Sequence, residues 1–166
     1  YYNFLLSVCS SSIYKFYFSK NESKQRLLTG VVNSLGIIQK NTYYRLNDDF
    51  SVQEGGTPFY QKGTNASFPY ENFQGPLWTI YKQTSTLDGT EFSAMSYEYE
   101  NAILHRQGLG FCGFTKILSY DMVRNRLSTR TFDPFQRGVL IKEVSPVSEI
   151  NYSYNVDTNS NTFWRK

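Results

Sequence analysis

The sequence predicts an all-β domain of about ten mostly antiparallel strands, joined in sequential hairpins into a curved sheet. The first observation is the aromatic content: 14 Tyr and 13 Phe among 166 residues favour pleated, half-buried surfaces. The second is that short apolar runs alternate with turn residues at close intervals. The third is that no stretch keeps a helical period between helix caps. The length fits one domain over residues 1–166, or one part of a larger one.

The first four strands are expected as two adjacent pairs. An apolar run at residues 2–8 and another at 13–18 are separated by a Cys-Ser-Ser-Ser turn. The next pair, 26–32 and 37–46, flanks a four-residue turn that runs from Asn33 to Gly36, a common type I pattern.

Residues 47–75 interrupt this regularity with repeated Gly and Pro. The stretch is too long for a simple turn, and its many aromatic side chains would be costly to expose. Two interpretations stay open: a lid over the end of the sheet, or a platform that stacks its rings on a ligand such as a sugar. The rings concerned are those of Phe50, Phe59, Tyr60, Phe68, Tyr70 and Phe73.

The strongest local signal is Asp88-Gly89, which predicts a tight hairpin between strands at 77–86 and 91–100 because this dipeptide accepts the required left-handed backbone. In the second arm, strict alternation places alternate residues on one face: Phe92, Ala94 and Ser96. The remaining strands are expected at 111–120, 126–132, 139–144 and 150–156.

Few residues could carry chemistry. The only His is His105, and no nucleophile motif surrounds it, so we expect no enzyme and no catalytic residue. One His and two separated Cys cannot build a multi-ligand metal site, and no cofactor is expected. Cys9 and Cys112 either form one disulfide in an exported chain or are separate small buried side chains.

Net charge and hydropathy pattern exclude further classes. A net charge of +3 with 19% charged residues gives no support for a nucleic-acid partner. No apolar run approaches the roughly 20 residues of a membrane-spanning helix, so direct membrane insertion is not expected. Four arginines either meet an anionic partner or form a solvated rim: Arg124, Arg126, Arg130 and Arg137.

The glycines Gly108, Gly110 and Gly113 have the G-x-G-x-x-G spacing of a dinucleotide fingerprint. That fingerprint should open a helix, whereas here the sequence continues as a strand. We therefore expect the glycines to allow a sharp turn or a close approach of the backbone to a neighbouring segment, with Phe111 and Phe114 packing beside them.

A Tyr-x-Tyr strand, a His and a glycine-rich turn follow one another in the chain, carried by Tyr97, Tyr99, His105, Gly108, Gly110, Phe111, Gly113 and Phe114. This is the most specific part of an ordered set of motifs over about residues 26–156, which resembles the SpvB/TcB-type toxin proteins and their Rhs/YD-repeat relatives. Tyr120-Asp121 followed by Asn125-Arg126-Leu127 resembles a degenerate YD repeat, with Arg124 in place of the usual glycine. Phe132-Asp133 followed by Gly138-Val139-Leu140 resembles the next one.

This resemblance implies a segment of a very long, secreted or cell-surface bacterial protein. In such relatives, YD-type hairpins coil into a hollow β-shell that encloses a C-terminal effector polypeptide. The chain would then form a partial β-shell whose partners are the rest of the shell and the effector, and its isolated form would self-associate through open strand edges. An alternative of another class is a carbohydrate- or surface-binding β-domain of the adhesin type.

Overall fold

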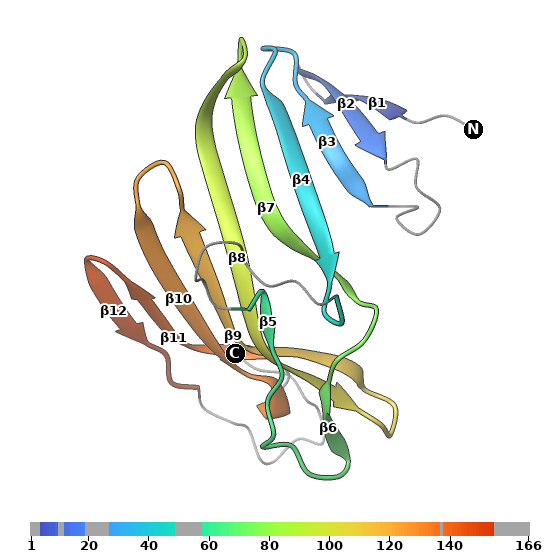
Figure 1. The fold of residues 1–166 in the computed structure, drawn as a ribbon, viewed down its shortest axis with the longest axis vertical. Helices are drawn as coiled ribbons and strands as arrows, with labels where there is room; N and C mark the ends of the chain where they lie inside the picture. The colour runs from blue at the N-terminus through green and yellow to red at the C-terminus, as the bar shows by residue number, and fades with distance from the viewer. Residues whose placement is uncertain (1–3, 10–11, 19–26, 49–57, 137, 155–166) are drawn as a thin grey trace.

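A computed structural model describes residues 4–9, 12–18, 27–48, 58–136 and 138–154. Within these ranges the chain is all-β, with twelve strands in one open, curved sheet, and this confirms the expected fold class (Figure 1). A short 3₁₀ turn at Pro134–Gln136 is the one helical element within the described ranges. In the same ranges, no helix has the length and apolar character needed to cross a membrane.

Strand order in the sheet follows strand order in the sequence, because most strands turn back directly onto the preceding one. Two short strands leave this path and both pair with β8: β5 (Tyr60–Gln61) and β6 (Tyr70–Phe73). The path itself runs through β1 (Phe4–Cys9), β2 (Ser12–Phe18), β3 (Leu28–Val32), β4 (Ile38–Arg45), β7 (Trp78–Leu87), β8 (Thr90–His105), β9 (Gly110–Asp121), β10 (Arg126–Asp133), β11 (Val139–Ser145) and β12 (Ser148–Asn151).

The hairpin expected at Asp88-Gly89 is confirmed. Strands β7 and β8 pair antiparallel up to Leu87 and Thr90, so the turn has two central residues. Asp88 and Gly89 both have positive φ, 48° and 79°, as a two-residue hairpin turn of the mirror-image type requires.

The turn between β3 and β4 also forms as its sequence predicts. The side-chain oxygen of Asn33 accepts hydrogen bonds from the N–H groups of Leu35 and Ile37, each at 3.0 Å. Gly36 has a φ of 80°, a conformation that glycine adopts without steric cost. Local chemistry therefore suffices to close this connection.

The alternation expected along the second arm of the hairpin is wrong at its start. Ser85 pairs with Ser93 and Thr86 with Glu91, so Phe92 is an extra residue in β8 and forms a bulge. Phe92 is 45% exposed, whereas Ala94 is fully buried. A bulge cannot be recognised from the spacing of apolar residues, which assumes an uninterrupted period of two.

Two strands also differ from expectation at their ends. Strand β8 continues beyond Glu100 to His105, because β6 and β9 pair with it on its two sides there. The last strand starts earlier than residue 150, since Ser145 Oγ accepts the Ser148 N–H at 3.1 Å and closes a turn of two central residues. It also ends earlier than expected, at Asn151, so residues 152–154 do not belong to it. Residues 155–156 of the expected strand lie outside the described ranges.

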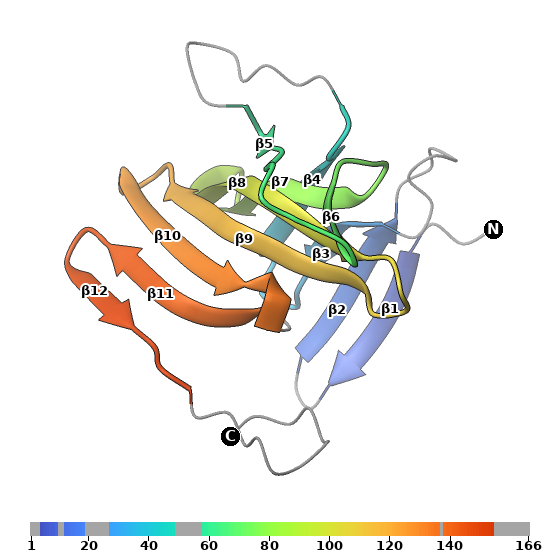
Figure 2. The same cartoon turned by 90° about the horizontal axis from the view of Figure 1, so that it is seen from below.

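The core lies on one face of the sheet over β4, β7, β8 and β9, and the chain around β5 supplies its centre (Figures 1 and 2). Phe59 is 1% exposed, and its ring makes edge-on contacts with those of Tyr44, Tyr81 and Tyr99 at centroid distances of 5.9, 5.8 and 5.5 Å. Edge-to-face packing of this kind adds about 0.5–1.5 kcal/mol per pair to apolar burial.

The aromatic segment before β7 divides between two roles. Phe59, Tyr60 and Phe73 pack in or against the core, as the lid interpretation expects. Phe68, by contrast, is 74% exposed. Phe50 lies outside the described ranges. The segment is thus not a lid of uniformly buried rings, and one ring is left facing water.

Candidate functional site

Two adjoining surface hollows lie where β6 meets the end of β8, and Tyr70 belongs to the lining of both. The larger measures about 400 Å³ and is here called the Arg106 hollow; it is lined by Lys62, Gly63, Ala66, Phe68, Tyr70, Glu71, Asn72 and Arg106. The smaller measures about 240 Å³ and is lined by Tyr70, Leu109, Phe111, Cys112, Pro134 and Phe135. The first mixes charged, amide and aromatic groups, whereas the second is mainly apolar.

A clasp of three asparagines holds the wall of the Arg106 hollow against the sheet. Asn101 donates to Asn65 Oδ1 at 2.8 Å and accepts a hydrogen bond from Asn72. Asn72 Oδ1 in turn accepts the Ala66 N–H at 2.9 Å. Asn101 is 8% exposed, so its polar side chain is satisfied inside the protein, as a buried amide requires.

Two features explain why the clasp has this form. Asn101 has a φ of 50°, a region that asparagine tolerates better than most residues. Gly63 leaves room for it, because a Cβ at that position would lie 2.2 Å from Asn101 Oδ1. The clasp therefore depends on an asparagine inside a strand and on a glycine 38 positions earlier in the chain.

Charges line the open side of the same hollow. The Nε of Arg106 donates to Glu71, and this hydrogen bond lowers the pKa of the Glu71 carboxyl below its ordinary value. The positive charge of Lys62 acts on Glu71 in the same direction. Both members of the ion pair reach solvent, with side chains 62% and 38% exposed. Two cationic side chains thus face one carboxylate.

The glycines of the glycine-rich turn have the conformational role that the sequence predicts. Gly108, Gly110 and Gly113 have φ values of 111°, 70° and 107°, which side-chain-bearing residues rarely adopt. The rings of Phe111 and Phe114 pack at 5.3 Å, as expected. The third glycine lies within strand β9 and opens no helix, so the structural context of the dinucleotide fingerprint is missing.

His105 is built into the same turn. Its Nδ1 accepts the Gln107 N–H at 3.2 Å, and its ring packs edge-on against Tyr70 at 4.8 Å. Cys112 is a half-buried free thiol. The Cys9 side chain lies outside the described part of the structure. Among the described residues, no group of three or more His, Cys, Asp or Glu side chains could hold a metal ion.

The Tyr-x-Tyr strand supplies the core. Tyr99 is 8% exposed and donates its hydroxyl to the Ile80 carbonyl at 2.8 Å. Burial raises the pKa of Tyr99, and the neighbouring Tyr97 adds to this effect. Tyr97 is half-buried beside the same cluster. These two positions are therefore structural, which their alternate spacing along a strand already indicates.

The Tyr120-Asp121 motif closes the turn between β9 and β10. Asp121 Oδ1 accepts the N–H groups of Val123 and Arg124 at 3.0 and 2.9 Å, and Tyr120 donates its hydroxyl to Asn125. The left-handed residue of this turn is Asn125, with a φ of 52°. Arg124 therefore does not occupy a position that needs glycine.

The Phe132-Asp133 motif repeats this device one hairpin later. Asp133 Oδ1 accepts the N–H groups of Phe135 and Gln136 at 3.0 and 3.2 Å. The turn closes at Gly138, whose φ is 69° and whose N–H donates to the Asp133 carbonyl at 2.8 Å. In both turns, an aspartate after an aromatic residue thus caps the backbone that leaves a strand.

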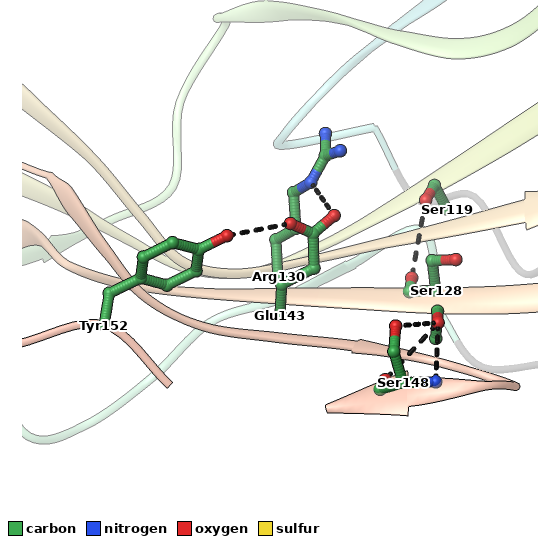
Figure 3. A network of polar contacts seen from close by, with 7 residues as sticks. Ser119, Ser128, Arg130, Glu143, Ser148 and Tyr152 are labelled. Carbon is green, nitrogen blue, oxygen red and sulfur yellow. Dashed lines mark hydrogen bonds and ion pairs between the residues drawn. The ribbon is translucent and has the colours of Figure 1, made fainter. Parts of the chain in front are cut away.

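Polar contacts cross the outer strands of the sheet (Figure 3). Glu143 accepts hydrogen bonds from Arg130 at 3.0 Å and Tyr152 at 3.5 Å, while Ser145 bonds Ser148 at 2.7 Å. Arg124 likewise pairs with Asp121, so two of the four clustered arginines are bound to carboxylates of their own chain. Arg137 lies outside the described ranges.

Two rings that line the Arg106 hollow, Phe68 and Tyr70, belong to the aromatic segment that the sequence singled out as a possible ligand platform. The sequence did not reveal its charged and amide residues. Lys62, Asn72 and Arg106 carry no recognisable motif, and the pairing of β5 and β6 with β8 brings them together. The one available signal was Asn101, a polar residue between Tyr99 and the apolar Ala102-Ile103-Leu104 run, where an unsatisfied amide would be costly.

Comparison with protein-family models, with curated proteins and with solved structures finds no match to this chain.

Proposed function

We propose that this chain is a non-enzymatic structural segment of a large secreted or cell-surface bacterial protein of the Rhs/YD-repeat type. In this role its sheet forms part of the wall of a β-shell. Its partners are the neighbouring hairpins of the parent chain and the effector polypeptide that the shell encloses or carries.

The observation that carries this proposal is a sheet whose outer half has no second layer among the described residues. A sheet normally buries one face against another layer, and the core cluster does so only from β4 to β9. In this outer half, on the face opposite the cluster, the cross-strand partners Tyr120 and Leu127 are 37% and 49% exposed. Apolar side chains at such positions are suited to contact further structure.

The consecutive aspartate turns add support. Asp121 and Asp133 each end a strand and each cap the following turn with their side-chain oxygen. Sequential hairpins that share this aspartate-capped turn can extend a sheet indefinitely in one direction, as the wall of a shell requires. The strand order of the sheet is consistent with such growth.

The test is whether the isolated 166-residue chain self-associates. Size-exclusion chromatography with light scattering over a range of concentrations measures this. Strand β12 is the last of the described sheet. The Tyr152 N–H donates inward to Ile141 at 2.9 Å, so strand alternation points the Asn151 N–H away from β11. We expect Asn151→Pro to weaken association by removing this outward donor, and Asn151→Ala to leave association unchanged.

A strictly monomeric chain at high concentration would contradict the proposal. So would a parent reading frame without further Tyr-Asp hairpins. Association could also persist in Asn151→Pro and be lost in Leu127→Lys. That result would assign the contact to the exposed face of the sheet rather than to its edge. It would still support the proposal, because the exposed face would then be a surface that further structure covers.

A further inference from the structure

We propose that the Arg106 hollow is a binding site for an acidic saccharide, with Phe68 as the stacking platform and Arg106 and Lys62 as the groups that recognise a carboxylate. This inference is independent of the shell proposal.

The first argument is the exposed ring of Phe68. It is 74% exposed, although Phe59 in the same aromatic segment is 1% exposed. A ring that is this exposed leaves its apolar faces available to a partner. The apolar face of a sugar ring is such a partner, because an aromatic ring offers a flat, rigid apolar surface.

The second argument is that Phe68 is presented by a fixed backbone. The Tyr70 N–H donates to the Ser67 carbonyl at 2.9 Å, and the Arg106 N–H donates to the Pro69 carbonyl at 2.9 Å. The asparagine clasp holds Ala66 on the other side. Because the backbone is already ordered on both sides of the ring, ligand binding would cost this segment little conformational entropy.

The third argument is the charge beside the ring. Arg106 and Lys62 line the hollow with one carboxylate, Glu71, which leaves one positive charge in excess. Arg106 contacts Glu71 through Nε, and its side chain, which lines the hollow, is 62% exposed. A planar guanidinium suits a carboxylate better than a neutral hydroxyl.

The size of the hollow agrees with this class of ligand. A volume of about 400 Å³ falls within the range of small-molecule sites, roughly 300–1,000 Å³. Because its lining combines an exposed ring with charged donors, the hollow matches a ligand with an apolar face and a charged edge. A uronic acid unit has both.

The experiment is an NMR titration of the 166-residue chain with tetragalacturonate, and with the neutral galactose tetramer as the matched probe. We expect amide shifts confined to the segment around Phe68 and Arg106, and tighter binding of the acidic probe. Added salt should weaken binding of the acidic probe and bring it close to that of the neutral one, since solvent-exposed charges are screened.

Matched variants separate the contributions. Phe68→Ala should weaken both probes about tenfold, consistent with the loss of one stacked ring. Arg106→Gln and Lys62→Gln should remove the preference for the acidic probe. Phe92→Ala, an exposed ring elsewhere in β8, and Arg130→Gln, an arginine paired with Glu143, should change neither affinity.

Three outcomes would overturn the proposal: no shifts with either probe at millimolar concentration, shifts centred away from the hollow, or binding that Phe68→Ala leaves unchanged. None of these outcomes bears on self-association, so this proposal and the shell proposal can fail separately.

Discussion

Phe59 and Tyr99 are joined twice although 40 positions separate them: their rings pack edge-on at 5.5 Å, and the Phe59 carbonyl accepts the Tyr99 N–H at 3.0 Å. The pair connects the segment before β5 to the middle of the longest strand. Leu46, Ala102 and Phe114 complete the buried cluster around this pair, so the contact lies at the centre of the core.

Replacing Phe59 by Ala should therefore lower the free energy of unfolding by about 3–5 kcal/mol, as expected for a buried Phe that leaves a cavity. Phe68→Ala is the matched control in the same segment, and its exposed ring predicts a change below about 0.5 kcal/mol. Urea unfolding of both variants measures the difference. Equal losses for the two would mean that the assignment of Phe59 to the core is wrong.

Gly89→Val should lower the free energy of unfolding by at least about 1 kcal/mol, because a β-branched residue is strained at a φ of 79°. No atom lies within 4 Å of the position that a Cβ would take, so the cost is conformational rather than steric crowding. Gly89→Asn should cost less, since Asn tolerates this region. A Val variant as stable as the Asn variant would contradict the turn assignment.

The turn at Asp121 should weaken in acid. Hydrogen bonds from the backbone N–H of Arg124, and then from its side chain, lower the pKa of the Asp121 carboxyl below its ordinary value. A group whose pKa is lower in the folded state stabilises that state above its unfolded pKa, about 3.9 for Asp, and this contribution is lost as pH falls through the folded value.

Asp121→Asn isolates this effect, because the amide keeps an acceptor oxygen but carries no charge. The stability difference between the natural chain and the variant should be present near about pH 6 and shrink towards about pH 2. Chemical denaturation across that range measures it. A difference that stays constant with pH would show that the charge of Asp121 contributes nothing.

Addition of NAD or ATP should leave the melting temperature unchanged, because the third glycine of the G-x-G-x-x-G spacing lies in strand β9 and presents no helix N-terminus to a phosphate. Thermal unfolding with and without nucleotide is the measurement. A rise of several degrees that Gly110→Ala removes would restore the dinucleotide interpretation.

The turns were predictable because their chemistry is local. Asp88-Gly89 and the Asn33 turn close hairpins through residues within four positions of one another, and such contacts form largely irrespective of the rest of the chain. The strands between these turns follow from alternating apolar residues, and their sequential pairing follows from the short connections. The all-β class and the order of the hairpin-linked strands were therefore determined by the sequence itself, whereas the pairing of β5 and β6 with β8 was not.

Only the tertiary structure decided which aromatic residue is buried and where a site forms. Phe59 and Phe68 belong to one segment and look alike in sequence, yet one is the centre of the core and the other faces water. Their difference comes from contacts with strands far along the chain. Asn101 likewise anchors Asn65 across 36 positions, and no local period encodes that contact. The Arg106 hollow exists because long-range pairing of β6 with β8 brings these residues together, and such pairing is a property of the whole sheet.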